Sequence, residues 1–142
     1  MLSKLFIDNY KCLANCFLEL KSINLFAGPN SSGKSSVLQA LLTASDNVSE
    51  NRGTHGLKNY RTEASSFNDV RNFITNAKSY EISLGCEKYE PTVLRFIPGD
   101  DSYQTTIVEQ LNDVSPILLN IFQTENLLYL PATRPGGTYI QA

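Results

Sequence analysis

The sequence at residues 23–44 is INLFAGPNSSGKSSVLQALLTA, and it contains the most specific pattern in the chain. Residues 23–27 form a short apolar run of strand type, and residues 35–44 have the composition and spacing of a helix. Between them, residues 28–35 read GPNSSGKS and match the G-x-x-x-x-G-K-[ST] phosphate-binding loop, the Walker A motif, at every position. Because this motif binds nucleotide when a strand precedes it and a helix follows it, the sequence predicts a nucleotide-binding loop.

Each residue type in this loop has a physical role. Gly28 and Gly33 allow the chain to turn around an anion, because a Cβ would obstruct both the unusual dihedral angles and the close approach. The helix that follows directs free N–H groups and partial positive charge at the phosphates. Lys34 is expected to reach the β- and γ-phosphate oxygens, and Ser35 to ligate Mg²⁺, so ATP and Mg²⁺ are the predicted cofactors. The predicted nucleotide-binding residues of the loop are Gly28, Asn30, Ser31, Ser32, Gly33, Lys34, Ser35 and Ser36.

Length and composition indicate one soluble globular domain. The chain has 142 residues, of which 42% are hydrophobic and 18% charged, and its net charge of −2 gives no general attraction to nucleic acid or to an anionic membrane. No apolar run approaches the roughly 20 residues of a membrane span, and the N-terminus lacks the pattern of a secretion signal. The three cysteines, Cys12, Cys16 and Cys86, have neither a disulfide-framework spacing nor a zinc-site spacing. A cytoplasmic protein with reduced thiols and no membrane contact is therefore expected.

Alternating apolar and polar residues predict several antiparallel strands. Residues 2–9 and 16–21 are expected to form a hairpin before the phosphate loop. Residues 80–86, 92–97 and 103–108 are expected to form a three-stranded meander, because turn-forming residues separate them.

The remaining segments are assigned from composition. Polar residues accumulate at residues 45–66, which predicts a surface loop after the helix. Residues 114–123 are predicted to be helical, with Pro116 in the first turn, and residues 127–130 to form a buried strand.

The N-terminal part resembles the start of ABC-type ATPases of the RecF, SMC and OLD (overcoming lysogenisation defect) branch. In that branch an I-x-N-aromatic-basic strand end precedes a G-P-N-x-S-G-K-S loop, and Ile7, Asn9, Tyr10 and Lys11 match the first element here. The resemblance implies that Lys11 lies near the nucleotide phosphates, so it joins the predicted nucleotide-binding residues. A solvated hairpin lysine is the alternative interpretation.

Two further segments carry looser resemblances to the AAA-type, OLD-like ATPases of bacterial defence systems. Residues 56–72, which end in SSFNDVRN, resemble a small-Phe-x-Asp segment of that group, although Asp69 and Arg71 could equally belong to an exposed helix start. Residues 130–139 resemble its Y-L-x-P-x-R-x-x-P-x-x-Y run, with Arg134 matching the arginine. An ordinary surface ion pair is the alternative for this arginine.

The predicted fold class is α/β (α+β), a P-loop NTPase that resembles an ABC ATPase head with an antiparallel β lobe. Such a head also requires an apolar strand ending in Asp-Glu and an LSGG-like signature, and the sequence contains neither. Residues 1–142 are therefore expected to be a single N-terminal domain and an incomplete half of the head, which binds ATP but does not turn it over steadily.

The leading functional hypothesis is ATP binding by the N-terminal part of an OLD/RecF/SMC-like ATPase. The resemblance implies that whole members pair two heads through ATP and use hydrolysis in a DNA-related role, in antiphage defence or DNA repair. It also implies a homodimer or pairing with another ATPase or nuclease subunit as the partner arrangement, and DNA only by family likeness.

Two alternatives belong to other classes. The first is a non-hydrolysing interaction or regulatory module that docks on a full-length ATPase. The second is a complete small P-loop kinase or GTPase. A GTPase requires an Asn-Lys-x-Asp guanine motif, and Asn68-Asp69 lacks its lysine.

Overall fold

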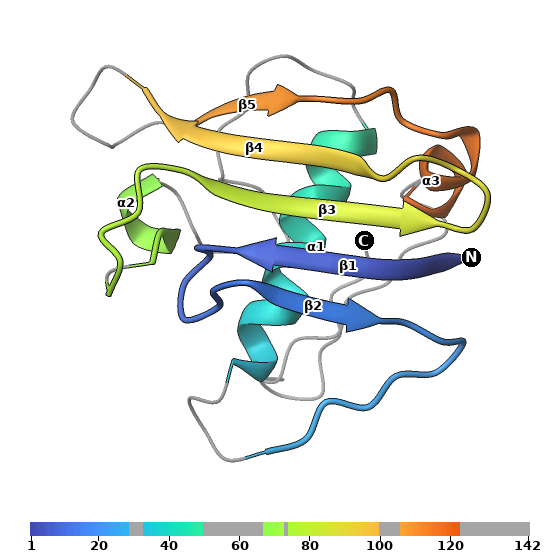
Figure 1. Ribbon diagram of the computed structural model, residues 1–142, viewed down its shortest axis with the longest axis horizontal. Helices are drawn as coiled ribbons and strands as arrows, with labels where there is room; N and C mark the ends of the chain where they lie inside the picture. Colours follow the sequence, from blue (N-terminus) through green and yellow to red (C-terminus); the bar gives the residue numbers. More distant parts are fainter. Residues whose placement is uncertain (29–32, 50–66, 73, 100–105, 123–142) are drawn as a thin grey trace, which may run out of the picture.

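The computed structural model describes residues 1–28, 33–49, 67–72, 74–99 and 106–122, and it consists of a five-stranded sheet with helix α1 across one face (Figure 1). The strand order is β2-β1-β3-β4-β5, and every neighbouring pair is antiparallel. The prediction of an α/β fold with an antiparallel sheet is confirmed. The elements in chain order are β1 (Leu2–Asp8), β2 (Cys16–Glu19), α1 (Lys34–Ser49), α2 (Phe67–Val70), β3 (Tyr80–Cys86), β4 (Thr92–Pro98), β5 (Thr106–Gln110) and α3 (Pro116–Ile121).

Both predicted strand groups form, and β1 joins them into one sheet. The hairpin pairs β1 with β2, and β3, β4 and β5 form the meander. On its other edge β1 pairs with β3, with Leu5 opposite Leu84 and Ile7 opposite Ile82. All four of these side chains are buried, because the register aligns the apolar residues of both strands on one face.

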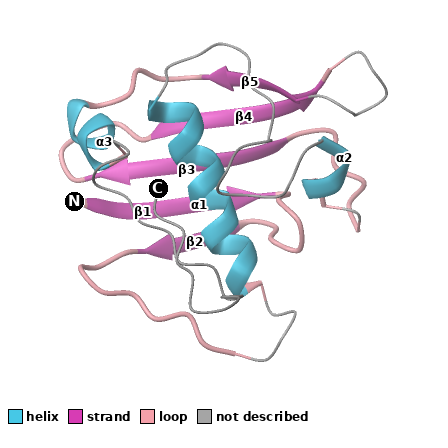
Figure 2. Cartoon of the chain, turned by 180° about the vertical axis from the view of Figure 1, so that it is seen from behind, coloured by secondary structure: helices cyan, strands magenta, loops and turns pink. Residues whose placement is uncertain are grey.

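The core lies between that face and α1, which crosses the sheet as Figure 2 shows. Val37, Ala40, Ala44 and Val48 are spaced by three and four residues, so they form one buried stripe along α1. Four aromatic rings pack at the end of the sheet near α2, where Tyr80 contacts each of the other three. Its centroid distances are 5.4 Å to Tyr10, 5.5 Å to Phe67 and 4.6 Å to Phe96.

Helix α1 is longer than predicted. It continues to Ser49, so the first five residues of the expected surface loop at 45–66 are helical, and Ser45 and Asn47 are buried. The Ser45 hydroxyl donates to the Leu42 carbonyl at 2.8 Å, and the Asn47 amide donates to the Thr43 carbonyl at 2.8 Å. These bonds within the helix give the Ser45 hydroxyl and the Asn47 amide nitrogen a partner where they are buried. Residues 50–66 lie outside the described part of the chain.

The predicted strand at residues 23–27 does not form. Ile23 is 90% exposed and Leu25 is 89% exposed, and among the described residues no strand pairs with this segment. The Asn24 side chain accepts from the Lys21 N–H at 2.9 Å and donates to the Lys21 carbonyl at 2.9 Å. This local pairing of an asparagine with the main chain competes with a strand ladder, which needs a partner strand in any case.

The described part of the C-terminal segment forms the predicted helix. Helix α3 forms within predicted residues 114–123, with Pro116 in its first turn, and the Ser115 hydroxyl caps it by accepting from the Leu118 N–H. The strand predicted at 127–130 lies outside the described residues. None of the helices in the described part of the chain is both long and apolar enough to span a bilayer.

Candidate functional site

The two ends of the GPNSSGKS segment lie together at the start of α1. The Lys34 ammonium donates to the Gly28 carbonyl, so the chain from 28 to 34 closes on itself. Gly28 has φ +152° and Gly33 has φ +96°, values that side chains with a Cβ rarely adopt. Both glycines thus have positive φ, a conformation for which glycine is the suitable residue. The predicted residues Asn30, Ser31 and Ser32 lie outside the described residues.

The first turn of α1 contains no acidic side chain that would compete with an anion for its N–H groups. The Gly33 carbonyl accepts from the Val37 N–H at 3.0 Å, so the helical bonding begins at Gly33. Helical geometry leaves the N–H groups of Lys34, Ser35 and Ser36 without acceptors inside the helix. The first turn contains no acidic residue, and the Ser35 side chain is exposed. An anion near this turn would therefore meet both free N–H groups and the positive end of the helix dipole.

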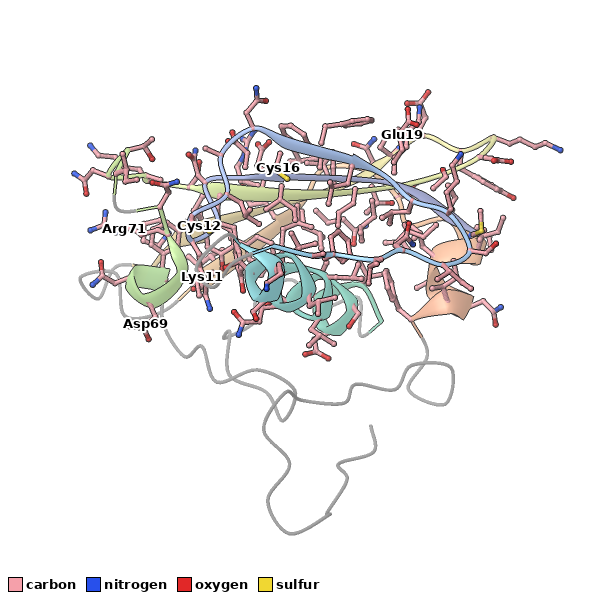
Figure 3. The ribbon with its side chains drawn as sticks, turned by 90° about the horizontal axis from the view of Figure 1, so that it is seen from below. Lys11, Cys12, Cys16, Glu19, Asp69 and Arg71 are labelled. Atoms are coloured by element: carbon pink, nitrogen blue, oxygen red, sulfur yellow. The ribbon has the colours of Figure 1, made fainter. Side chains whose placement is uncertain are left out.

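The turn between β1 and β2 lies against the same helix end. The Lys11 ammonium donates to the Gln39 side-chain oxygen on α1, and the Cys12 thiol lies 3.9 Å from the Ser36 hydroxyl oxygen. Figure 3 shows Lys11 and Cys12 between α2 and α1. A residue 17 positions before the loop is thus brought to the first turns of the helix that follows the loop.

Lys11 is partly desolvated in this position. Burial lowers the pKa of its ammonium, while the nearby Cys12 and Asp69 act in the opposite direction and favour the charged form. Its ammonium also lies 5.9 Å from the centre of the Tyr10 ring. Gln39 is an uncharged acceptor, so a phosphate within reach of Lys11 would satisfy the ammonium better than the amide does.

The β1–β2 turn has a constrained backbone that sequence reasoning did not identify as part of the site. Asn9, Lys11 and Asn15 have φ of 61°, 50° and 51°. Asparagine tolerates this left-handed region, so Asn9 and Asn15 were the available signal for a tight turn, whereas Lys11 carried none. Gln39 was also missed, because a single glutamine on a helix matches no motif.

The looser predictions have mixed outcomes. Asp69 lies on the single-turn helix α2, and Arg71 follows that helix, so the segment is helical in part. The Arg71 guanidinium donates to the Asn68 side-chain oxygen at 3.0 Å and to the Ala77 carbonyl at 3.4 Å, which are local structural bonds. Arg134 lies outside the described residues.

Comparison with known protein families identifies the family to which these residues belong. A scan against models of protein families matches residues 1–126 to the AAA ATPase domain. A search of curated proteins finds no match. The matched residues include the β1–β2 turn, both ends of the phosphate loop and all of α1. The chain accordingly belongs to the AAA ATPase domain family, whose members bind nucleotide and usually Mg²⁺.

Proposed function

We propose that this chain binds Mg²⁺-ATP at the N-terminus of α1, through residues 28–36, as a nucleotide-binding ATPase domain. The observation that carries the proposal is the bond between the Lys34 ammonium and the Gly28 carbonyl, which closes the loop ahead of an unblocked helix start. A bound phosphate would replace the Gly28 carbonyl as the partner of Lys34. The main-chain N–H groups at the start of α1 would bind the same phosphates, since they have no acceptor within the helix.

Ser35 is the residue proposed to hold Mg²⁺. Its side chain is exposed in the first turn of α1, and a hydroxyl oxygen is a hard ligand of the type that Mg²⁺ prefers. In P-loop NTPases the Ser or Thr that follows the loop lysine is one of the protein ligands of Mg²⁺, and phosphates and water supply others, so Ser35 fits that role. The metal neutralises charge on the β- and γ-phosphates when it is bound.

We further propose that Lys11 supplies a second positive charge to the phosphates and that the domain belongs to the OLD/RecF/SMC-like branch. Support comes from the bond of Lys11 to Gln39 on α1, which brings the last residue of the I-x-N-aromatic-basic element close to the phosphate loop. A role in DNA-related defence or repair follows from the family resemblance and is part of the same proposal.

Calorimetric titration with ATP, with and without Mg²⁺, tests these roles separately. In Ser35→Ala the gain in affinity that Mg²⁺ provides should largely disappear, while binding of metal-free ATP changes little. In Lys11→Ala affinity should fall by about tenfold under both conditions, because a charge-assisted hydrogen bond contributes about 1.5–3 kcal/mol. Ser83→Ala, on β3, is the matched serine control and should bind as the wild type does.

Two results would contradict the assignments. A dependence on Mg²⁺ that is unchanged in Ser35→Ala would remove the metal role from this serine. Wild-type affinity in Lys11→Ala would leave Lys11 as a structural lysine that serves only Gln39.

A further inference from the structure

We propose that Leu13, in the turn between β1 and β2, is a positioning residue that holds Gly33 in its nucleotide-binding conformation. The inference rests on the proposed function, and it adds a residue that the phosphate-loop motif does not contain. Leu13 acts through Gly33 and does not itself touch the nucleotide.

The contact between the turn and Gly33 is close. A Cβ built on Gly33 would lie 3.1 Å from Leu13 Cδ2 and 3.2 Å from the Cys12 sulfur, both shorter than ordinary van der Waals contacts. Gly33 is buried at this point, whereas the Ser35 side chain two residues later is exposed. The turn therefore covers the side of Gly33 on which any other residue would carry its side chain.

Main-chain hydrogen bonds hold the turn in place, so it can serve as a rigid support for Gly33. Tyr10 and Leu13 exchange two main-chain hydrogen bonds, of 3.1 Å and 2.9 Å. The Lys11 N–H donates to the Val70 carbonyl at the end of α2, and the Asn72 N–H donates to the Asn9 carbonyl at 2.9 Å. The first two bonds close the turn on itself, and the other two tie it to the end of α2 and to the segment that follows α2.

Side chains add to this support. Tyr10 is fully buried and packs edge-on against Tyr80 at 5.4 Å between ring centroids. Leu13 is half-buried and packs against the core cluster that Tyr10 belongs to. Figure 1 shows the turn and α2 at the same end of the sheet. Leu13, which contacts Gly33, is therefore supported by the core cluster that contains the packed rings of Tyr10 and Tyr80.

The contact with Leu13 helps to keep the Gly33 backbone at its positive φ. At φ +96° glycine has no steric preference that would keep it there, so the conformation has to be imposed by neighbours. Leu13 and Cys12 lie next to the position that a Cβ of Gly33 would take, so they limit movement of Gly33 toward the turn. Because Gly33 precedes the free N–H groups of Lys34, Ser35 and Ser36, its orientation determines where these groups converge.

The test compares Leu13→Ala with Leu18→Ala, which removes an equivalent partly buried leucine from β2 of the same hairpin. Calorimetry should show a three- to tenfold loss of Mg²⁺-ATP affinity in Leu13→Ala and wild-type affinity in Leu18→Ala. Amide hydrogen exchange, followed by NMR without nucleotide, should be faster at Val37, whose N–H donates to the Gly33 carbonyl, in Leu13→Ala but unchanged in β3. Leu13→Met, which restores the volume, should recover both the affinity and the protection.

The outcomes separate this inference from the proposed function. Wild-type protein that does not bind Mg²⁺-ATP would overturn the proposed function. Wild-type protein that binds, together with Leu13→Ala of unchanged affinity and unchanged Val37 exchange, would overturn only the positioning role. Equal losses of affinity in Leu13→Ala and Leu18→Ala would also overturn it, since they would show a general effect of hairpin stability. If Leu13→Ala does not fold, the smaller truncation Leu13→Val replaces it, with an expected loss of about twofold and the same exchange pattern.

Discussion

Lys34→Ala is expected to lower the affinity for Mg²⁺-ATP by about 100-fold or more while leaving the fold intact. A charge-assisted hydrogen bond contributes about 1.5–3 kcal/mol, and loss of the ammonium also removes the one side-chain charge within the loop. At about 1.4 kcal/mol per tenfold change in affinity, the upper end of this range corresponds to about 100-fold. Calorimetric titration measures the change.

The fold should be unaffected because Lys34 is only half-buried and its bond to Gly28 lies at the surface. Removal of such a side chain changes the free energy of unfolding by about 0.5 kcal/mol or less. Lys4→Ala is the matched control, since this lysine is exposed on β1 and should leave affinity and stability unchanged. Retained affinity in Lys34→Ala would contradict the role assigned to its ammonium.

Gly33→Ala is expected to be the most damaging single-methyl addition in the described part of the chain. The residue has φ +96°, where a Cβ is strained whatever the surrounding space, and the new Cβ would also crowd Leu13 and Cys12. Holding a residue in such a region costs about 1–3 kcal/mol. Relief of this strain would rotate the main chain at the start of α1, so we expect a loss of at least tenfold in Mg²⁺-ATP affinity together with a lower free energy of unfolding.

Gly85→Ala is a closely matched control for this substitution. A Cβ on Gly85 would lie 3.2 Å from the Lys4 Cβ, which is about as tight as the contacts of Gly33, but the position is in β3 and its φ is not in the left-handed region. Calorimetry and denaturant unfolding of both variants separate crowding from backbone strain. Equal affinity losses in the two variants would show that the conformation of Gly33 has no special part in nucleotide binding.

Much of the sheet could be predicted from the sequence because its signal is local. Strict alternation identified β3 at its observed bounds, and turn residues separated it from β4. The pairing of β1 with β3 had no such signal, since the choice of partner between segments about 70 residues apart depends on packing of the whole core. Ile23 and Leu25 gave a false strand signal, because an apolar alternation becomes a strand only where another strand accepts its hydrogen bonds.

The candidate site divides in the same way. The glycines, Lys34 and the helix start could be predicted because the phosphate loop is contiguous in sequence. Gln39 and Leu13 could not, because they reach the site through the packing of the hairpin against α1, which no local pattern encodes. A nucleotide-binding role for Lys11 rests on family resemblance, and its partner on α1 is a finding of the structure.

Thermal unfolding of the wild-type protein with and without Mg²⁺-ATP tests the central claim most directly. A ligand that binds only the folded state stabilises it by about 2.7 kcal/mol at 100 times its Kd, which for a domain of this size raises the Tm by several degrees. We predict this rise for the wild type and its absence for Lys34→Ala at the same nucleotide concentration. An unchanged Tm in the wild type at millimolar Mg²⁺-ATP, or an equal rise in Lys34→Ala, would contradict nucleotide binding at the start of α1.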